Sequence, residues 1–74
     1  MDNRMKRELV GFVKRYRLES ELENVKRMLE VGLQIKEAVI VGDEKRYMRL
    51  LDEFSNYYCL MNYEMLSAFS ELLA

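Results

Sequence analysis

The sequence predicts an all-α fold: a helical hairpin with an additional N-terminal helix, which completes a bundle by homodimerisation. The 74 residues include no proline and are rich in Leu, Glu, Lys, Arg and Met, which all favour helix. Apolar residues recur at helical spacing along most of the chain. A chain of this length forms one small domain, so we expect residues 1–74 to make up a single helical domain.

The first helix is predicted over residues 2–17, and its apolar face comprises Met5, Leu9, Phe12, Val13 and Tyr16. At 100° per residue, this face and the apolar face of the segment that follows point to nearly opposite sides. We therefore expect the chain to bend near residues 17–20. The alternative is one continuous helix of about 40 residues, shared between two subunits.

The second helix is predicted over residues 20–41. Ser20 followed by Glu23 has the pattern of a capping box, which predicts that Ser20 begins this helix. Gly32 lies on the apolar face, where the lack of a side chain would let an aromatic residue of the last helix come close. After this helix, Gly42 and Asp43 predict a tight turn, because glycine adopts the left-handed conformation past a helix end and aspartate caps the next helix.

The third helix is predicted over residues 43–73. Apolar residues follow one another at alternating spacings of four and three, namely Tyr47, Leu51, Phe54, Tyr58, Met61, Met65, Ala68 and Leu72. Such a sustained repeat is typical of coiled-coil packing. A helix of this length is about 45 Å long, whereas the second helix covers only about 33 Å of it.

The end of the chain is expected to be an interface. Residues 57–74 are apolar on nearly all sides, and their only charges are Glu64 and Glu71. We expect a second subunit or another partner to cover them, through Cys59, Leu60, Tyr63, Leu66, Phe69 and Leu73. In the alternative, the first helix folds back over this face and completes a monomeric three-helix bundle. The thiol of Cys59 is expected to be buried and inert.

Composition excludes several kinds of chemistry. The chain has no histidine and a single cysteine, so it holds neither a histidine-dependent catalytic pair nor a cysteine-rich zinc site. Its three glycines are too scattered for a phosphate-binding loop. We expect no enzyme activity, no cofactor and no metal. No apolar stretch is long enough for a signal peptide or a membrane span, so we expect a cytoplasmic protein.

The charges are unevenly distributed, although the net charge is only −1. Six of the first 17 residues are Lys or Arg, whereas residues 50–74 contain four acidic residues and no basic one. On the first helix, the side opposite the apolar face carries Arg4, Arg7, Lys14 and Arg15. Such a side contacts nucleic-acid phosphates in some proteins, an anionic membrane in others, and only water in many.

These observations predict a small helical protein–protein interaction protein, acting as a homodimer in the role of an adaptor, a regulator or an assembly component. The alternative function is a nucleic-acid-binding regulator that uses the basic N-terminal helix.

Overall fold

The computed structural model describes residues 2–74, which form four α-helices and two short 3-10 turns. The helices are α1 (Asn3–Arg15), α2 (Leu22–Val41), α3 (Glu44–Ser55) and α4 (Tyr63–Leu73), and the 3-10 turns are Glu19–Glu21 and Tyr58–Leu60. The radius of gyration is 12.3 Å and the globule measures 35 × 27 × 19 Å. No strand occurs between residues 2 and 74, so the all-α prediction is confirmed.

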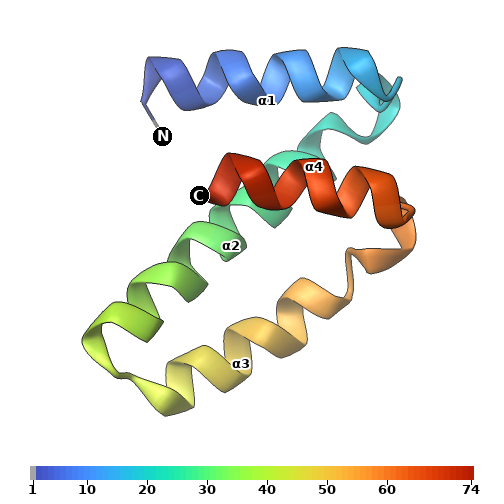
Figure 1. Cartoon of the computed structure of the whole chain (residues 1–74). Helices are drawn as coiled ribbons and strands as arrows, with labels where there is room; N and C mark the ends of the chain where they lie inside the picture. Colours follow the sequence, from blue (N-terminus) through green and yellow to red (C-terminus); the bar gives the residue numbers. More distant parts are fainter. Residues whose placement is uncertain (1) are drawn as a thin grey trace.

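The helices are arranged around α2 (Figure 1). α2 and α3 form an antiparallel hairpin, whose turn is the part of the molecule farthest from α1. α4 crosses the first half of α2 and lies between α1 and α3, in contact with α1. One end of the globule therefore contains all four helices, whereas the other end contains the hairpin alone.

The predicted bend between the first two helices is confirmed. Arg17 adopts a left-handed conformation, with φ of 55°. The N–H of Leu18 donates to the carbonyl oxygen of Val13 at 2.9 Å, and that of Arg17 donates to Lys14 at 3.3 Å, which together form a Schellman motif. One continuous helix through this region is thereby excluded.

The predicted start of α2 at Ser20 is wrong. Ser20 lies inside the 3-10 turn Glu19–Glu21, and α2 begins two residues later at Leu22. An N-cap residue needs an extended backbone conformation. The tight turn that follows the left-handed Arg17 does not leave Ser20 in that conformation.

The predicted turn at Gly42 and Asp43 is confirmed. Gly42 has φ of 75°, and the N–H of Asp43 donates to the carbonyl oxygen of Ala38 at 2.9 Å, which forms a second Schellman motif. The side chain of Asp43 then accepts a hydrogen bond from the backbone N–H of Arg46 at 3.1 Å and caps α3.

The single helix predicted over residues 43–73 is wrong. α3 ends at Ser55, the backbone is extended at Met61, and Asn62 caps α4 by accepting a hydrogen bond from the N–H of Met65 at 2.9 Å. The break lets α4 fold back toward α1 and α2, where Met61 and Phe69 become buried. A straight helix would carry these side chains away from α1, so burial favours the break over the repeat.

Two clusters of buried side chains form the core. The larger comprises Leu9, Phe12, Val13, Val25, Met28, Leu29, Met61 and Phe69, from α1, α2, α4 and the segment before α4. The smaller lies within the hairpin and comprises Val31, Ala38 and Leu50. Phe54 packs against both clusters and therefore links them.

The close approach expected at Gly32 is confirmed, with a different neighbour. A Cβ on Gly32 would lie 2.8 Å from Cδ1 of Leu73 in α4. The residue that faces the glycine is thus a leucine rather than an aromatic one. The contact between Leu73 and Gly32 marks the position along α2 at which α4 crosses it.

Candidate interaction surfaces

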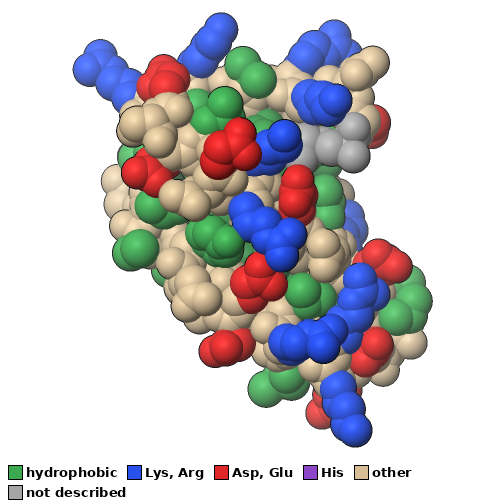
Figure 2. Space-filling view, turned by 180° about the vertical axis from the view of Figure 1, so that it is seen from behind, with side chains coloured by type: hydrophobic (Ala, Val, Ile, Leu, Met, Phe, Trp, Pro, Cys, Tyr) green, Lys and Arg blue, Asp and Glu red, His purple; other side chains and the backbone are tan. Residues whose placement is uncertain are grey.

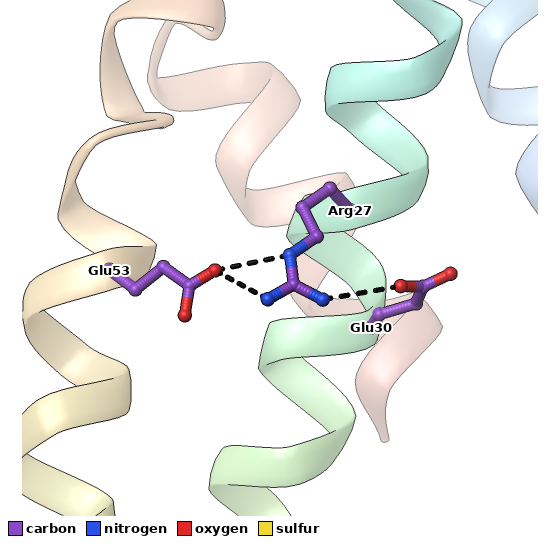
Figure 3. Close-up of polar contacts among 3 residues, drawn as sticks. All are labelled: Arg27, Glu30 and Glu53. Carbon is purple, nitrogen blue, oxygen red and sulfur yellow. Dashed lines mark hydrogen bonds and ion pairs between the residues drawn. The ribbon is translucent and has the colours of Figure 1, made fainter.

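One side of the hairpin carries ion pairs within α2 and between α2 and α3. Nε and Nη2 of Arg27 both donate to Oε1 of Glu53, at 3.1 and 2.7 Å, and Nη1 lies 3.5 Å from Glu30 (Figure 3). The hydrogen bonds that Arg27 donates to Glu53, together with the negative charge of that carboxylate, raise the pKa of Arg27. Nearer the turn, Arg46 lies 3.8 Å from Glu37.

The ion-paired side faces away from α4. In Figure 3 the three side chains stand in front of α2 and α3, with α4 behind them. Figure 2 views the molecule from behind and shows blue and red side chains distributed over the hairpin. Because its charges satisfy one another across the two helices, this side is suited to contact with water.

The other side of the hairpin is covered by α4 along α2 only as far as Gly32 and Lys36. Leu73 packs on Gly32, and Nζ of Lys36 donates to the carbonyl oxygen of Leu73 at 3.0 Å. Val39 lies seven residues after Gly32 and therefore continues the same face. Ile40, four residues after Lys36, does the same. Their side chains are 60% and 76% exposed.

α3 adds further apolar side chains to the uncovered end. A pocket of about 200 Å³ lies between the two helices, and its lining includes Val39, Glu44 and Tyr47. Met48, which is 60% exposed, and Leu51 lie four and seven residues after Glu44 and share its face of α3. We name this region the tip surface and define it by Ile35, Val39, Ile40, Met48 and Leu51.

The residues predicted to form an interface at the end of the chain do not form one exposed surface. Phe69 is 1% exposed and packs edge-on against Phe12 of α1, with ring centroids 5.7 Å apart. Three other residues of the predicted interface are half-buried and pack against the larger core cluster, namely Leu60, Leu66 and Leu73. Tyr63, by contrast, is 88% exposed.

Cys59 is exposed, so the prediction of a buried thiol is wrong. It lies in the 3-10 turn Tyr58–Leu60, where its Sγ is 3.8 Å from the carbonyl oxygen of Asn56. The expectation of burial depended on a continuous helix at this position. The break between α3 and α4 removes that helix and turns the side chain toward solvent.

The basic residues predicted on the first helix are all exposed but differ in their surroundings. Arg4 forms an ion pair with Glu8 at 3.2 Å, and the guanidinium of Arg15 lies 5.2 Å from the ring centroid of Tyr16. Arg15 also lines a groove between α1 and α4 together with Glu71. Arg7 and Lys14 make no ion pair within residues 2–74.

A second pocket lies between α1 and the start of α2. Its volume is about 300 Å³, and we name it the basic pocket, defined by its lining residues Lys6, Leu9, Val10, Leu22, Glu23 and Lys26. Val10 and Leu22 are partly exposed within it. Sequence reasoning missed this site because Leu22 and Lys26 lie far from Lys6 in the sequence. They come to lie beside α1 only in the folded chain.

Sequence reasoning also missed the tip surface, although a signal for it was present. Val39, Ile40 and Val41 are three consecutive apolar residues in a helix. Consecutive helical residues point in directions 100° apart, so one neighbouring helix cannot cover all three. The uncovered apolar surface was instead expected at the end of the chain.

Other kinds of site receive no support from residues 2–74. Within this range, no three His, Cys, Asp or Glu side chains are grouped so that they could hold a metal ion. No helix there has the length and apolar character needed to cross a bilayer. Comparison with family models, with curated proteins and with solved structures finds no match to this chain.

Proposed function

We propose that this chain is a protein–protein interaction protein that acts as a homodimer, in the manner of an adaptor, a regulator or an assembly component. The observation that carries the proposal is the tip surface, where Val39, Ile40 and Met48 remain 60–76% exposed beside half-buried Ile35 and Leu51. Exposed apolar groups at adjacent positions on two helices mark an interaction site.

The shape of the hairpin supports a second copy as the occupant. Two antiparallel helices with one ion-paired side and one apolar side are half of a four-helix bundle. A two-fold axis at the tip surface would place the same apolar residues of both copies against each other. The uncovered end of α2 would then be buried as α4 buries the part around Gly32.

The charges around the tip surface are compatible with self-association. The tip surface is flanked by Lys36, four residues before Ile40 on α2, and by Glu44, four residues before Met48 on α3. Both signs occur within a few residues of the tip surface. A two-fold arrangement can therefore place opposite charges opposite each other at the rim of the interface.

Light scattering on the purified chain tests the proposal. At tens of micromolar, the wild-type protein is expected to have about twice the mass of the 8.9 kDa chain. Met48→Glu should give a monomer, because an unpaired charge in a buried apolar interface is costly. Helicity by circular dichroism should not change, since Met48 is exposed within one copy.

A matched control uses Val41, which is 64% exposed but lies on a different side of α2 from Val39 and Ile40. Val41→Glu should leave the dimer intact. A wild-type protein that is monomeric at this concentration would overturn the proposal, and so would equal association of the Met48→Glu and wild-type proteins.

We propose no catalytic role for the chain. It has no histidine, and its carboxylates lie on solvated helix surfaces, which supports interaction rather than chemistry. The nucleic-acid alternative is weakened by the surroundings of Arg4 and Arg15, which already face Glu8 and Tyr16.

A further inference from the structure

The basic pocket is lined by both aliphatic and basic side chains. Leu9, Val10 and Leu22 provide aliphatic surface between α1 and α2, and Lys6 and Lys26 provide positive charge. A volume of about 300 Å³ is at the lower limit of ligand pockets. It suits one or two apolar side chains better than a large organic cofactor.

The positive charge extends beyond the pocket along α1. Lys6, Val10 and Lys14 follow one another at four-residue spacing and therefore lie on one strip of the helix, with Arg7 beside Lys6. None of Lys6, Arg7, Lys14 and Lys26 makes an ion pair with another part of the described chain. The acidic residue that lines the pocket is Glu23.

Arg17 strengthens the positive charge at the end of the same helix. It occupies a left-handed position at which glycine is the residue of lowest strain. Its side chain is exposed. An arginine in this position adds a cation to the surface of α1 at some expense of backbone stability.

We propose that the basic pocket binds an acidic segment of a partner protein, which inserts an aliphatic or aromatic side chain between Val10 and Leu22 while its carboxylates meet Lys6, Lys26 and Lys14. The inference deepens the proposed function by naming the chemistry of the partner, and it rests on the role in protein interaction but not on the dimer. Charge complementarity with the lysines of the pocket favours an acidic partner. The aliphatic lining favours a partner that also inserts an apolar side chain.

Two other anionic partners fit the pocket less well. Single-stranded nucleic acid is held by stacking on aromatic rings, whereas the residues that line this pocket are aliphatic or charged. A membrane surface favours apolar side chains that project from a helix face, whereas Val10 and Leu22 line a concavity. A peptide side chain fills a concavity of this size and offers carboxylates on either side of it.

Selection from a displayed library of random dodecapeptides tests the proposal with the full chain as bait. Enriched peptides are expected to combine several Asp or Glu residues with a Leu, Ile or Phe. A synthetic copy of the best peptide, labelled with a fluorophore, then gives the affinity by anisotropy. Replacing its apolar anchor with serine should weaken binding about tenfold or more.

Charge-reversal variants locate the site on the protein. Lys6→Glu combined with Lys26→Glu should weaken binding of the selected peptide by about tenfold or more. The matched control, Lys45→Glu combined with Arg49→Glu, changes the net charge equally at exposed positions of α3 and should bind as wild type. Val10→Ser should also weaken binding, whereas Val41→Ser should not.

Several results would overturn the inference: no enriched peptide, enriched peptides without acidic residues, or equal loss of binding in both charge-reversal variants. Labelled single-stranded and duplex DNA and phosphatidylserine vesicles are measured beside the peptide. If DNA or vesicles bind more tightly than the peptide and lose binding in the Lys6/Lys26 variant, the pocket serves that partner instead. Met48→Glu, which tests the dimer, should leave peptide affinity unchanged, so the two proposals fail separately.

Discussion

One face of α2 is buried in one region of the molecule and exposed in another. Around Gly32, α4 crosses the helix, and Leu73 packs on the glycine, which is buried. About two turns later, Val39 and Ile40 occupy the same face and are mostly exposed. The difference arises from what lies beside the helix, because the helix itself is continuous through both regions.

The comparison shows that an amphipathic pattern identifies which residues can be buried but not which residues are buried within one chain. The crossing end has a core of aromatic and aliphatic residues from all parts of the chain, whereas the tip has only the small cluster Val31, Ala38 and Leu50. The stability of the single chain should therefore be concentrated at the crossing end, and its potential for association at the tip.

The largest effect is expected from Phe69→Ala. Phe69 is 1% exposed and contacts the rings of Phe12 and Phe54, so its removal should lower the free energy of unfolding by about 3–5 kcal/mol. Urea denaturation measures the loss. Tyr63→Ala, at an 88% exposed position of the same helix, should change it by less than about 0.5 kcal/mol. Similar losses in both variants would mean that α4 does not pack on the crossing end.

The contact between Gly32 and Leu73 can be tested with a double-mutant cycle. Gly32→Ala adds a methyl group 2.8 Å from Leu73, and overpacking of this kind costs about 1–3 kcal/mol. It also gains about 1 kcal/mol of helix propensity, so the net change should be small or unfavourable. In a Leu73→Ala background, the same substitution should stabilise the protein by about 1 kcal/mol.

Gly11→Ala provides the control for this cycle. A Cβ at Gly11 would meet no atom within 4 Å among residues 2–74, so alanine should stabilise α1 by about 1 kcal/mol in either background. Thermal melts of the six proteins give the comparison. Absence of coupling between positions 32 and 73 would show that α4 crosses α2 elsewhere.

The two Schellman motifs, one at each end of the molecule, predict substitutions of opposite sign. Arg17→Gly should stabilise the protein by about 1 kcal/mol, because it removes a side chain from a left-handed position. Gly42→Ala should destabilise it by about 1 kcal/mol for the converse reason. Chemical denaturation of both variants measures the effects, and equal signs would contradict the left-handed conformation at one of them.

The substitution Asn62→Ala distinguishes the folded-back α4 from a continuous helix. As the N-cap of α4, Asn62 accepts a hydrogen bond from Met65, so alanine should destabilise the protein by about 1 kcal/mol. In a continuous helix, alanine would instead stabilise this position by about 0.7 kcal/mol or less. The sign of the change in melting temperature decides between them.

Local chemistry made some elements predictable. The left-handed preference of glycine and the capping carboxylate fix the turn at Gly42 and Asp43 whatever packs around them. The misaligned apolar faces of the first two helices required a bend, and Arg17 provides it without glycine. The all-α class follows from composition, which acts residue by residue.

The break before α4 depended on competition between two patterns in the same segment. The apolar repeat favoured a continuous helix, whereas in the structure Asn62 is an N-cap and Glu64 lies in the first turn of α4. Burial of Met61 and Phe69 against α1 decides for the break. That burial involves residues some fifty positions away, which local patterns do not contain.

Composition and local patterns are sufficient to predict that this protein is helical, where its hairpin turns, and that it has more apolar surface than one face per helix can cover. The location of the uncovered part depends on how the whole chain packs. By folding back, α4 buries Phe69 and covers α2 around Gly32, whereas Val39, Ile40 and Met48 at the tip stay exposed. The physical reason is that burial depends on the full set of neighbours in space, whereas helix propensity and capping depend on neighbours in sequence.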